Sequence, residues 1–234
     1  MNFSALIFAL TVVHGVSGAC TPPTSASCNQ DLLQCCGLQL KADLALSNCN
    51  GILAYEPDCH RQEIENMYTN GTSGLLFVCD AFNKYYECLG TARRDCTSVG
   101  FHVKAGLKLS DAINVVSMYR QFGFACGAGF EGFSNNDACM SQIFSSKQTQ
   151  ISRCRTQFTN NIAADYKNHC MYFEQFTGCF NALFDHSLCN VESSWWGCEY
   201  ARQSGRIVLH DCNLQCSCWF ESKFTVSESC ISAV

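Results

Sequence analysis

The sequence predicts an all-α fold, a bundle of amphipathic helices stapled by disulfide bonds. Apolar side chains recur at the spacing of an α-helix in five segments, and 20 of the 234 residues are cysteine. Sustained alternation of polar and apolar residues, which a half-buried strand requires, is missing. Only residues 206–209 alternate, and this run is too short to build a sheet.

Each predicted helix carries an apolar stripe along one face. The stripes cover residues 33–44, 75–89, 112–122, 140–158 and 162–184. Side chains that can cap a helix N-terminus precede three of them, at Thr72 or Ser73, at Ser110 or Asp111, and at Asp137. Cysteines share these apolar faces, so we expect disulfide bonds to join one helix to the next.

The composition excludes several classes of protein. Hydrophobic residues make up 47% of the chain and charged residues 15%, unlike a disordered, highly charged chain. The net charge of −5 argues against a nucleic-acid-binding protein, because such proteins present a basic patch. Three prolines and 16 glycines exclude collagen-like and proline-rich repeats.

The N-terminus has the pattern of a signal peptide. Residues 6–13 are apolar and residues 16–19 are small, as in the hydrophobic region and the cleavage site of such peptides. We predict a signal peptide over residues 1–19 and a mature chain that begins at Cys20. No other apolar run approaches the roughly 18 residues that span a bilayer, and the C-terminus lacks the tail of a GPI signal. The predicted location is secreted and extracellular.

The even number of cysteines predicts a framework of up to ten disulfide bonds in a secreted chain. The sequence leaves the order of pairing open. The candidates are Cys20, Cys28, Cys35, Cys36, Cys49, Cys59, Cys79, Cys88, Cys96, Cys126, Cys139, Cys154, Cys170, Cys179, Cys189, Cys198, Cys212, Cys216, Cys218 and Cys230.

The spacing of the cysteines favours two halves. The longest stretch without cysteine lies between Cys96 and Cys126 and contains glycines and polar residues, so we expect a linker there. We place the halves at residues 20–105 and 106–234. Nine cysteines precede the stretch and eleven follow it. If all of them pair within the chain, at least one bridge crosses the boundary, or Cys126 folds back onto the first half.

An internal similarity suggests that the halves are related. Residues 79–96 (CDAFNKYYECLGTARRDC) resemble residues 170–189 (CMYFEQFTGCFNALFDHSLC) in their aromatic, helical pattern. A duplication explains this similarity, and so does chance resemblance between cysteine-rich helices.

Two motifs have the spacing of metal and nucleotide sites. Residues 212–218 (CNLQCSC), with His210 ahead of them, resemble a zinc-ligand cluster, but cysteines in an oxidising compartment favour disulfides. Residues 127–132 (GAGFEG) match the dinucleotide-binding fingerprint, but a predicted helix stands where that fingerprint needs a strand. We interpret this segment as a turn and predict neither a metal site nor a cofactor.

We predict no catalytic residues. His60 beside Cys59 and His169 beside Cys170 combine the residue types of a nucleophile and its base, but a nucleophilic thiol has to be free. The chain also lacks the Gly-x-Ser-x-Gly motif of many hydrolases.

Modification and contact are the remaining roles that the sequence suggests. A glycosylation sequon (NGT) begins at Asn70, although Asn-Gly also favours a turn. The aromatic pairs at residues 195–196 and 219–220 have neighbouring side chains about 100° apart on a helix, so one of each pair can face a partner. The candidate partner contacts are Trp195, Trp196 and Trp219.

Two segments carry a resemblance to a known family. Residues 73–79 (SGLLFVC), followed by Phe82, Tyr86, Cys88 and Leu89, form the first, and residues 124–139 (FACGAGFEGFSNNDAC) form the second. Together they resemble the secreted cysteine-rich helical domains of unknown function that are expanded in nematodes, a group that includes a chondroitin-proteoglycan type. The resemblance implies an extracellular, non-enzymatic protein with no catalytic residues.

We therefore expect a secreted cysteine-rich protein that acts by binding or as a matrix or coat component. Its expected partner is an extracellular protein, a glycan or a lipid, and not a nucleic acid. A lipid or small-ligand carrier is the alternative, since aromatic helices can enclose an apolar cavity. A secreted hydrolase without a recognisable motif is a third hypothesis.

Overall fold

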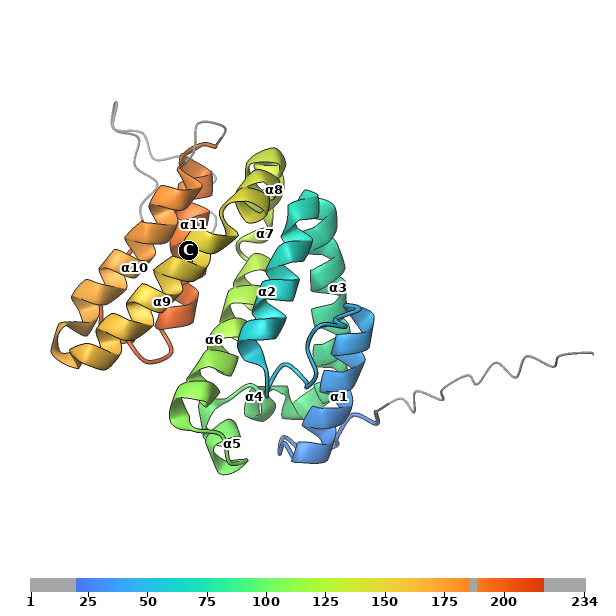
Figure 1. Ribbon diagram of the computed structural model, residues 1–234. Coiled ribbons are helices and arrows are strands. Elements are labelled where there is room, and N and C mark those ends of the chain that lie inside the picture. The colour runs from blue at the N-terminus through green and yellow to red at the C-terminus, as the bar shows by residue number, and fades with distance from the viewer. Residues whose placement is uncertain (1–19, 186–188, 217–234) are drawn as a thin grey trace, which may run out of the picture.

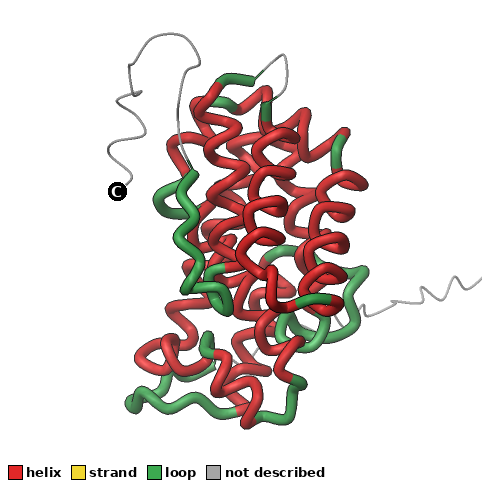
Figure 2. The backbone as a smooth tube through the Cα atoms, turned by 90° about the vertical axis from the view of Figure 1, so that its left-hand side faces the viewer, coloured by secondary structure: helices red, strands yellow, loops and turns green. Residues whose placement is uncertain are grey.

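The computed structural model describes residues 20–185 and 189–216. Helices and loops make up these residues and strands are absent from them, so the predicted all-α fold is confirmed (Figure 2). The predicted signal peptide over residues 1–19 lies outside the described residues, as do Cys218, Trp219 and Cys230.

Eleven α-helices and three short 3-10 helices follow one another along the described chain (Figure 1). The α-helices are α1 (Gln30–Asp43), α2 (Pro57–Met67), α3 (Gly71–Leu89), α4 (Arg93–Cys96), α5 (Val99–Lys104), α6 (Leu109–Ala125), α7 (Phe130–Asn135), α8 (Asp137–Ser146), α9 (Gln148–Ala164), α10 (His169–Phe184) and α11 (Val191–Gly205). The 3-10 helices are η1 (Tyr68–Asn70), η2 (Gly90–Ala92) and η3 (Tyr166–Asn168). The first three predicted stripes lie on α1, α3 and α6, which confirms those helices.

The last two predicted helices are each divided. The stripe at residues 140–158 covers α8 and α9, which meet at Lys147. The stripe at residues 162–184 begins at the end of α9 and continues on α10. Asp165 causes the second break. Its Oδ1 accepts a hydrogen bond from the Lys167 N–H at 3.1 Å, which replaces a helical bond with a local turn.

The predicted stripes do not include α2 and α11, whose buried faces mix apolar and polar side chains. His60, Arg61 and Glu65 are buried on α2, and Ser194 and Glu199 are buried on α11. A helix with charges on its buried face is not recognisable by amphipathic spacing.

Helix α6 lies in the middle of the molecule. In Figure 1, α9, α10 and α11 form one side and α1 and α3 the other, with α2 and α6 between them. The linker predicted between Cys96 and Cys126 is therefore wrong. This stretch forms α5 and α6, and the side chains of Val115, Met118 and Phe122 on α6 are buried in the core.

All 18 cysteines in the described residues form disulfide bonds, which confirms the disulfide-stapled architecture. The nine bridges are Cys20–Cys35, Cys28–Cys96, Cys36–Cys88, Cys49–Cys59, Cys79–Cys126, Cys139–Cys189, Cys154–Cys179, Cys170–Cys212 and Cys198–Cys216. The predicted tenth bridge stays a prediction, since Cys218 and Cys230 lie outside the described residues.

Twelve of these cysteines form two sets of six that share one order of pairing. The first set is Cys28, Cys36, Cys79, Cys88, Cys96 and Cys126, and the second is Cys139, Cys154, Cys170, Cys179, Cys189 and Cys212. In each set the first cysteine pairs with the fifth, the second with the fourth, and the third with the sixth. This shared order supports a relation between the two parts of the chain. The bridge Cys79–Cys126 crosses the boundary predicted after residue 105, which confirms that Cys126 folds back onto the first half. The boundary itself falls inside the first set of cysteines.

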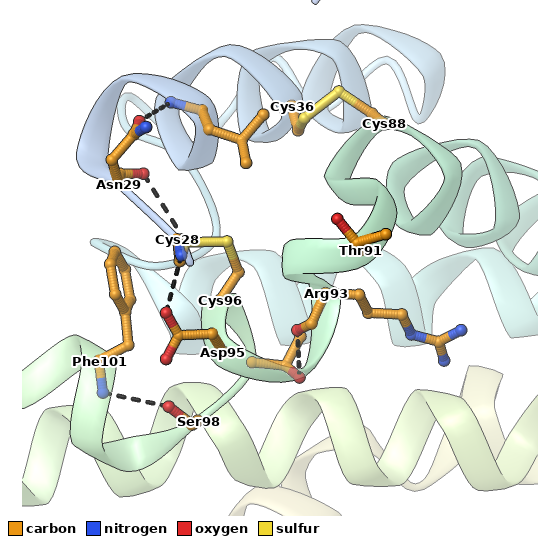
Figure 3. Close-up of a disulfide and its surroundings, with 12 residues drawn as sticks. Cys28, Asn29, Cys36, Cys88, Thr91, Arg93, Asp95, Cys96, Ser98 and Phe101 are labelled. Atoms are coloured by element: carbon orange, nitrogen blue, oxygen red, sulfur yellow. Dashed lines mark hydrogen bonds between the residues drawn. A yellow bond between two sulfur atoms is a disulfide. The ribbon is translucent and has the colours of Figure 1, made fainter. Parts of the chain in front are cut away.

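The start of the described chain is anchored by one of these bridges (Figure 3). Cys28 is bonded to Cys96, and its backbone N–H donates to Asp95 Oδ2 at 2.7 Å. The next residue, Asn29, caps α1 by accepting a hydrogen bond from the Leu32 N–H at 2.8 Å. The bridge and the cap together fix where α1 begins.

The bridge Cys79–Cys126 closes a loop of 47 residues, and Cys49–Cys59 closes one of 10. On loop-closure entropy alone, replacing both members of the longer bridge with Ser is expected to lower the free energy of unfolding by about 4 kcal/mol. The matched variant Cys49→Ser/Cys59→Ser should lose about 3 kcal/mol. Denaturant unfolding followed by tryptophan fluorescence measures both, and a Cys79→Ser/Cys126→Ser variant as stable as wild type would contradict the expectation.

Candidate functional site

A buried ion pair joins α2 to the C-terminal helices. Glu65 on α2 is 1% exposed, and the Arg155 guanidinium on α9 donates to both of its carboxylate oxygens, with Nη1 2.9 Å from Oε2. The Tyr200 hydroxyl on α11 donates to Glu65 Oε1 at 2.8 Å. The carboxylate therefore links three helices that are distant in sequence.

A second arginine lies beside this pair. Arg61 on α2 is nearly buried, and its Nη2 donates to Asn114 Oδ1 at 2.9 Å and to Ser117 Oγ at 2.8 Å, both on α6. The exposed Asp58 carboxylate is 3.8 Å from Arg61 Nη1. Burial, reinforced by the charge of Arg155, lowers the pKa of Arg61 to about 10, so it remains a cation at neutral pH.

The surroundings of Glu65 hold the neighbouring groups in one protonation state. Burial raises the pKa of the Tyr200 hydroxyl well above its usual value, and the Glu65 charge adds to this effect. Burial disfavours the charge of Arg155, but the Glu65 carboxylate outweighs it and raises the pKa of that guanidinium. Because both Glu65 oxygens accept hydrogen bonds within the protein, this cluster is built as a structural ion pair rather than as an acid or base for a substrate.

An aromatic cluster lies next to the ion pair. The indole of Trp196 stacks on Tyr200, with ring centroids 4.8 Å apart and planes 15° apart. Its Nε1–H donates to the Gly129 carbonyl at 2.8 Å. A Cβ on Gly129 would meet the Phe124 ring at 2.7 Å and the Trp196 indole at 2.8 Å, so only glycine fits there.

Residues 127–129 of the glycine-rich segment form a turn between α6 and α7 that admits the Trp196 indole. Residues 130–132 begin α7, so the predicted turn is confirmed only in its first half. The prediction of Trp196 as a partner contact is wrong, because its side chain is fully buried. Trp195 is partly exposed and packs edge-on against Phe124, with centroids 6.1 Å apart, so its contact role stays a prediction. Trp219 lies outside the described residues.

The two Cys-His neighbours cannot supply a nucleophile and its base. Cys59 and Cys170 are both in disulfide bonds. Both ring nitrogens of His169 are engaged, with Nε2 3.0 Å from Asp211 Oδ2 and Nδ1 2.9 Å from the Tyr166 carbonyl. The Asp211 contact raises the pKa of His169.

The zinc-like segment at residues 212–218 also lacks free thiols where it is described. Cys212 is bonded to Cys170 and Cys216 to Cys198, and a disulfide sulfur is not a thiolate ligand. In the described residues, each of the three groups of His, Cys, Asp and Glu side chains close enough to share an ion contains disulfide-bonded cysteines.

A small groove lies between α9 and α10, beside the bridge Cys154–Cys179. Its volume is about 30 Å³, which suits one water molecule and is far below the several hundred Å³ of a typical ligand site. Phe158 and Phe176 stack along it, with ring centroids 4.5 Å apart. Among the helices described, none combines the length and the apolar character that crossing a membrane requires.

Comparison of the chain with protein-family models, with curated proteins and with solved structures finds no match. The fold and the side-chain geometry define a disulfide-stapled, all-α protein whose central polar groups serve its own packing.

The buried carboxylate of Glu65 is expected to contribute much more to the free energy of unfolding than an exposed carboxylate does. Glu65→Gln leaves Arg155 buried without its counter-charge and is expected to lower the free energy of unfolding by about 3–5 kcal/mol. Asp80→Asn, which removes the exposed ion pair with Lys84, is the control and should cost less than about 1 kcal/mol. Equal losses in chemical denaturation of the two variants would rule out a special role for Glu65.

A buried histidine makes stability depend on pH. His102 on α5 is fully buried and stacks near Tyr119, with centroids 6.3 Å apart. Burial lowers the pKa of His102 to about 4, and the nearby Cys96 carbonyl reduces this shift. Neither ring nitrogen has a partner of good hydrogen-bond geometry. The folded state therefore resists protonation of this ring.

The pH prediction follows from the lowered pKa of His102. Above the ordinary value of 6.5 the ring is neutral in both states, and between pH 6.5 and about 4 only the unfolded chain takes up the proton. Stability should fall by about 3 kcal/mol across this window from His102 alone. His102→Leu should flatten the fall. Val103→Ala, a control at an exposed position of the same helix that titrates no group, should leave it unchanged. Identical pH profiles for wild type and His102→Leu in urea unfolding would refute the prediction.

Proposed function

We propose that the mature chain is a secreted, non-enzymatic, cysteine-rich protein that acts by binding or as a component of an extracellular matrix or coat. The observation that carries the proposal is the complete pairing of the 18 described cysteines. Disulfides at this density persist in oxidising compartments and are rare in the cytosol. The predicted signal peptide over residues 1–19 provides the route to that compartment.

The state of the polar groups supports binding over catalysis. The buried Glu65 carboxylate accepts hydrogen bonds at both oxygens, and His169 uses both ring nitrogens within the chain. Each group is thereby committed to an internal partner. The resemblance of residues 73–79 and 124–139 to secreted helical domains points to the same class of protein and remains a prediction.

The filled core favours surface contact over carriage of a ligand. The Trp196 ring is in contact with Phe133, Phe144 and Phe184, with centroids 5.5, 6.1 and 5.5 Å from its own. Large apolar side chains are also exposed on several helices, where they can contact an extracellular protein, a glycan or a lipid. In the described residues these are Leu38, Tyr55, Leu76, Phe77, Val103, Leu109, Tyr166 and Met171.

Expression of the full chain in a eukaryotic secretory system tests this proposal. We expect protein in the medium that begins at Cys20. It should take up no thiol-alkylating reagent before reduction, because the 18 described cysteines are paired and we predict a bridge between Cys218 and Cys230. Mass spectrometry of the intact protein, alkylated with and without prior reduction, measures both properties. Native mass spectra of the same sample report any retained partner. Retention inside the cell, or several alkylated cysteines without reduction, would refute the proposal.

A further inference from the structure

The sequon at Asn70 lies at the junction of η1 and α3. Asn70 is exposed, and its side chain makes no capping hydrogen bond to α3. Its carbonyl oxygen accepts a hydrogen bond from Ser73 Oγ at 2.8 Å. The amide nitrogen that would carry a glycan is therefore accessible on the folded protein.

The hydroxyl of the third residue of the sequon, the half-buried Thr72, is engaged within the protein. Thr72 Oγ1 donates to Asp137 Oδ1 at 2.6 Å, and the Thr72 backbone N–H donates to the same oxygen. Asp137 is the first residue of α8, so it caps α3 from another helix. Gly71 adopts a φ of +63° and approaches the Asp137 carboxylate so closely that a Cβ would collide with it.

The chemistry of N-glycosylation gives this contact a consequence. The Asn side-chain nitrogen bonds to the anomeric carbon of an oligosaccharide carried on a lipid pyrophosphate. The bond from that carbon to the phosphate oxygen breaks, the lipid pyrophosphate leaves, and the amide proton passes to the transferase. The sequon requires Ser or Thr two residues after Asn. The transferase therefore has to reach this hydroxyl as well as the amide.

We propose that Asn70 carries an N-linked glycan that is attached before α8 packs against α3, and that this packing then closes the site. The proposal rests on the proposed secretion of the chain. Asp137 follows Thr72 by 65 residues, so the sequon is synthesised well before the carboxylate that engages its threonine. At 5–20 residues per second, this leaves about 3–13 s for transfer.

The decisive experiment compares two forms of the full chain as acceptors. Unglycosylated protein, oxidised and folded or reduced and unfolded, is incubated with a microsomal extract and the lipid-linked oligosaccharide, and glycan transfer is read by mass. We expect the unfolded form to accept the glycan at least tenfold faster. Asn70→Gln should abolish transfer in both forms.

Two variants, one at the start of α8 and one in the first turn of α3, separate the contact between Thr72 and Asp137 from general stability. Folded Asp137→Ala, checked for a native disulfide pattern, should regain transfer because Thr72 is released. Folded Ser73→Ala should stay resistant, because it loses only the bond to the Asn70 carbonyl. Equal transfer to folded and unfolded wild type would overturn the closure of the site. Absence of transfer to the unfolded chain would overturn the glycosylation site itself. Secretion and thiol pairing are tested separately, by mass spectrometry of the secreted, alkylated protein.

Discussion

Disulfide bonds hold pairs of neighbouring helices together in both parts of the chain, and the arrangement of the remaining helices builds on these pairs. Cys36–Cys88 holds α1 against α3 with Cα atoms 5.7 Å apart, and Cys154–Cys179 holds α9 against α10 at 6.0 Å. Cys79–Cys126 fixes the end of α6 to α3 while the body of α6 packs against α11. The same order of pairing thus places equivalent helices in both parts of the chain.

A costly buried ion pair lies at the centre, between helices that none of the described disulfide bonds joins. Taking Glu65 and Arg155 out of water costs several kcal/mol for each ion, and only good geometry offsets that cost. The Tyr200 hydroxyl and the two-point contact with Arg155 supply that geometry. Since the described bridges do not join α2 to α9 or α11, the ion pair and its hydrogen bonds form a direct link between the two parts of the chain.

The sequence predicts the fold class and part of the helices for clear physical reasons. Helices α3 and α6 present apolar faces, so spacing alone reveals them. Helix α2 buries Arg61 and Glu65 beside Ile64. The partners of these charges lie on α6 and α9, far away in sequence, so the sequence does not show that the charges face the core. For the same reason the sequence of the sequon does not reveal the contact of Thr72 with Asp137. Tertiary packing also decides that Trp196 is buried while Trp195 is partly exposed.

Peptide mapping of the disulfides in non-reduced, secreted protein tests the central claim most directly. The account predicts two sets of three bridges with the same order, Cys28–Cys96, Cys36–Cys88 and Cys79–Cys126 in the first, and Cys139–Cys189, Cys154–Cys179 and Cys170–Cys212 in the second. A bridge between the sets, or a different order within either one, would contradict it.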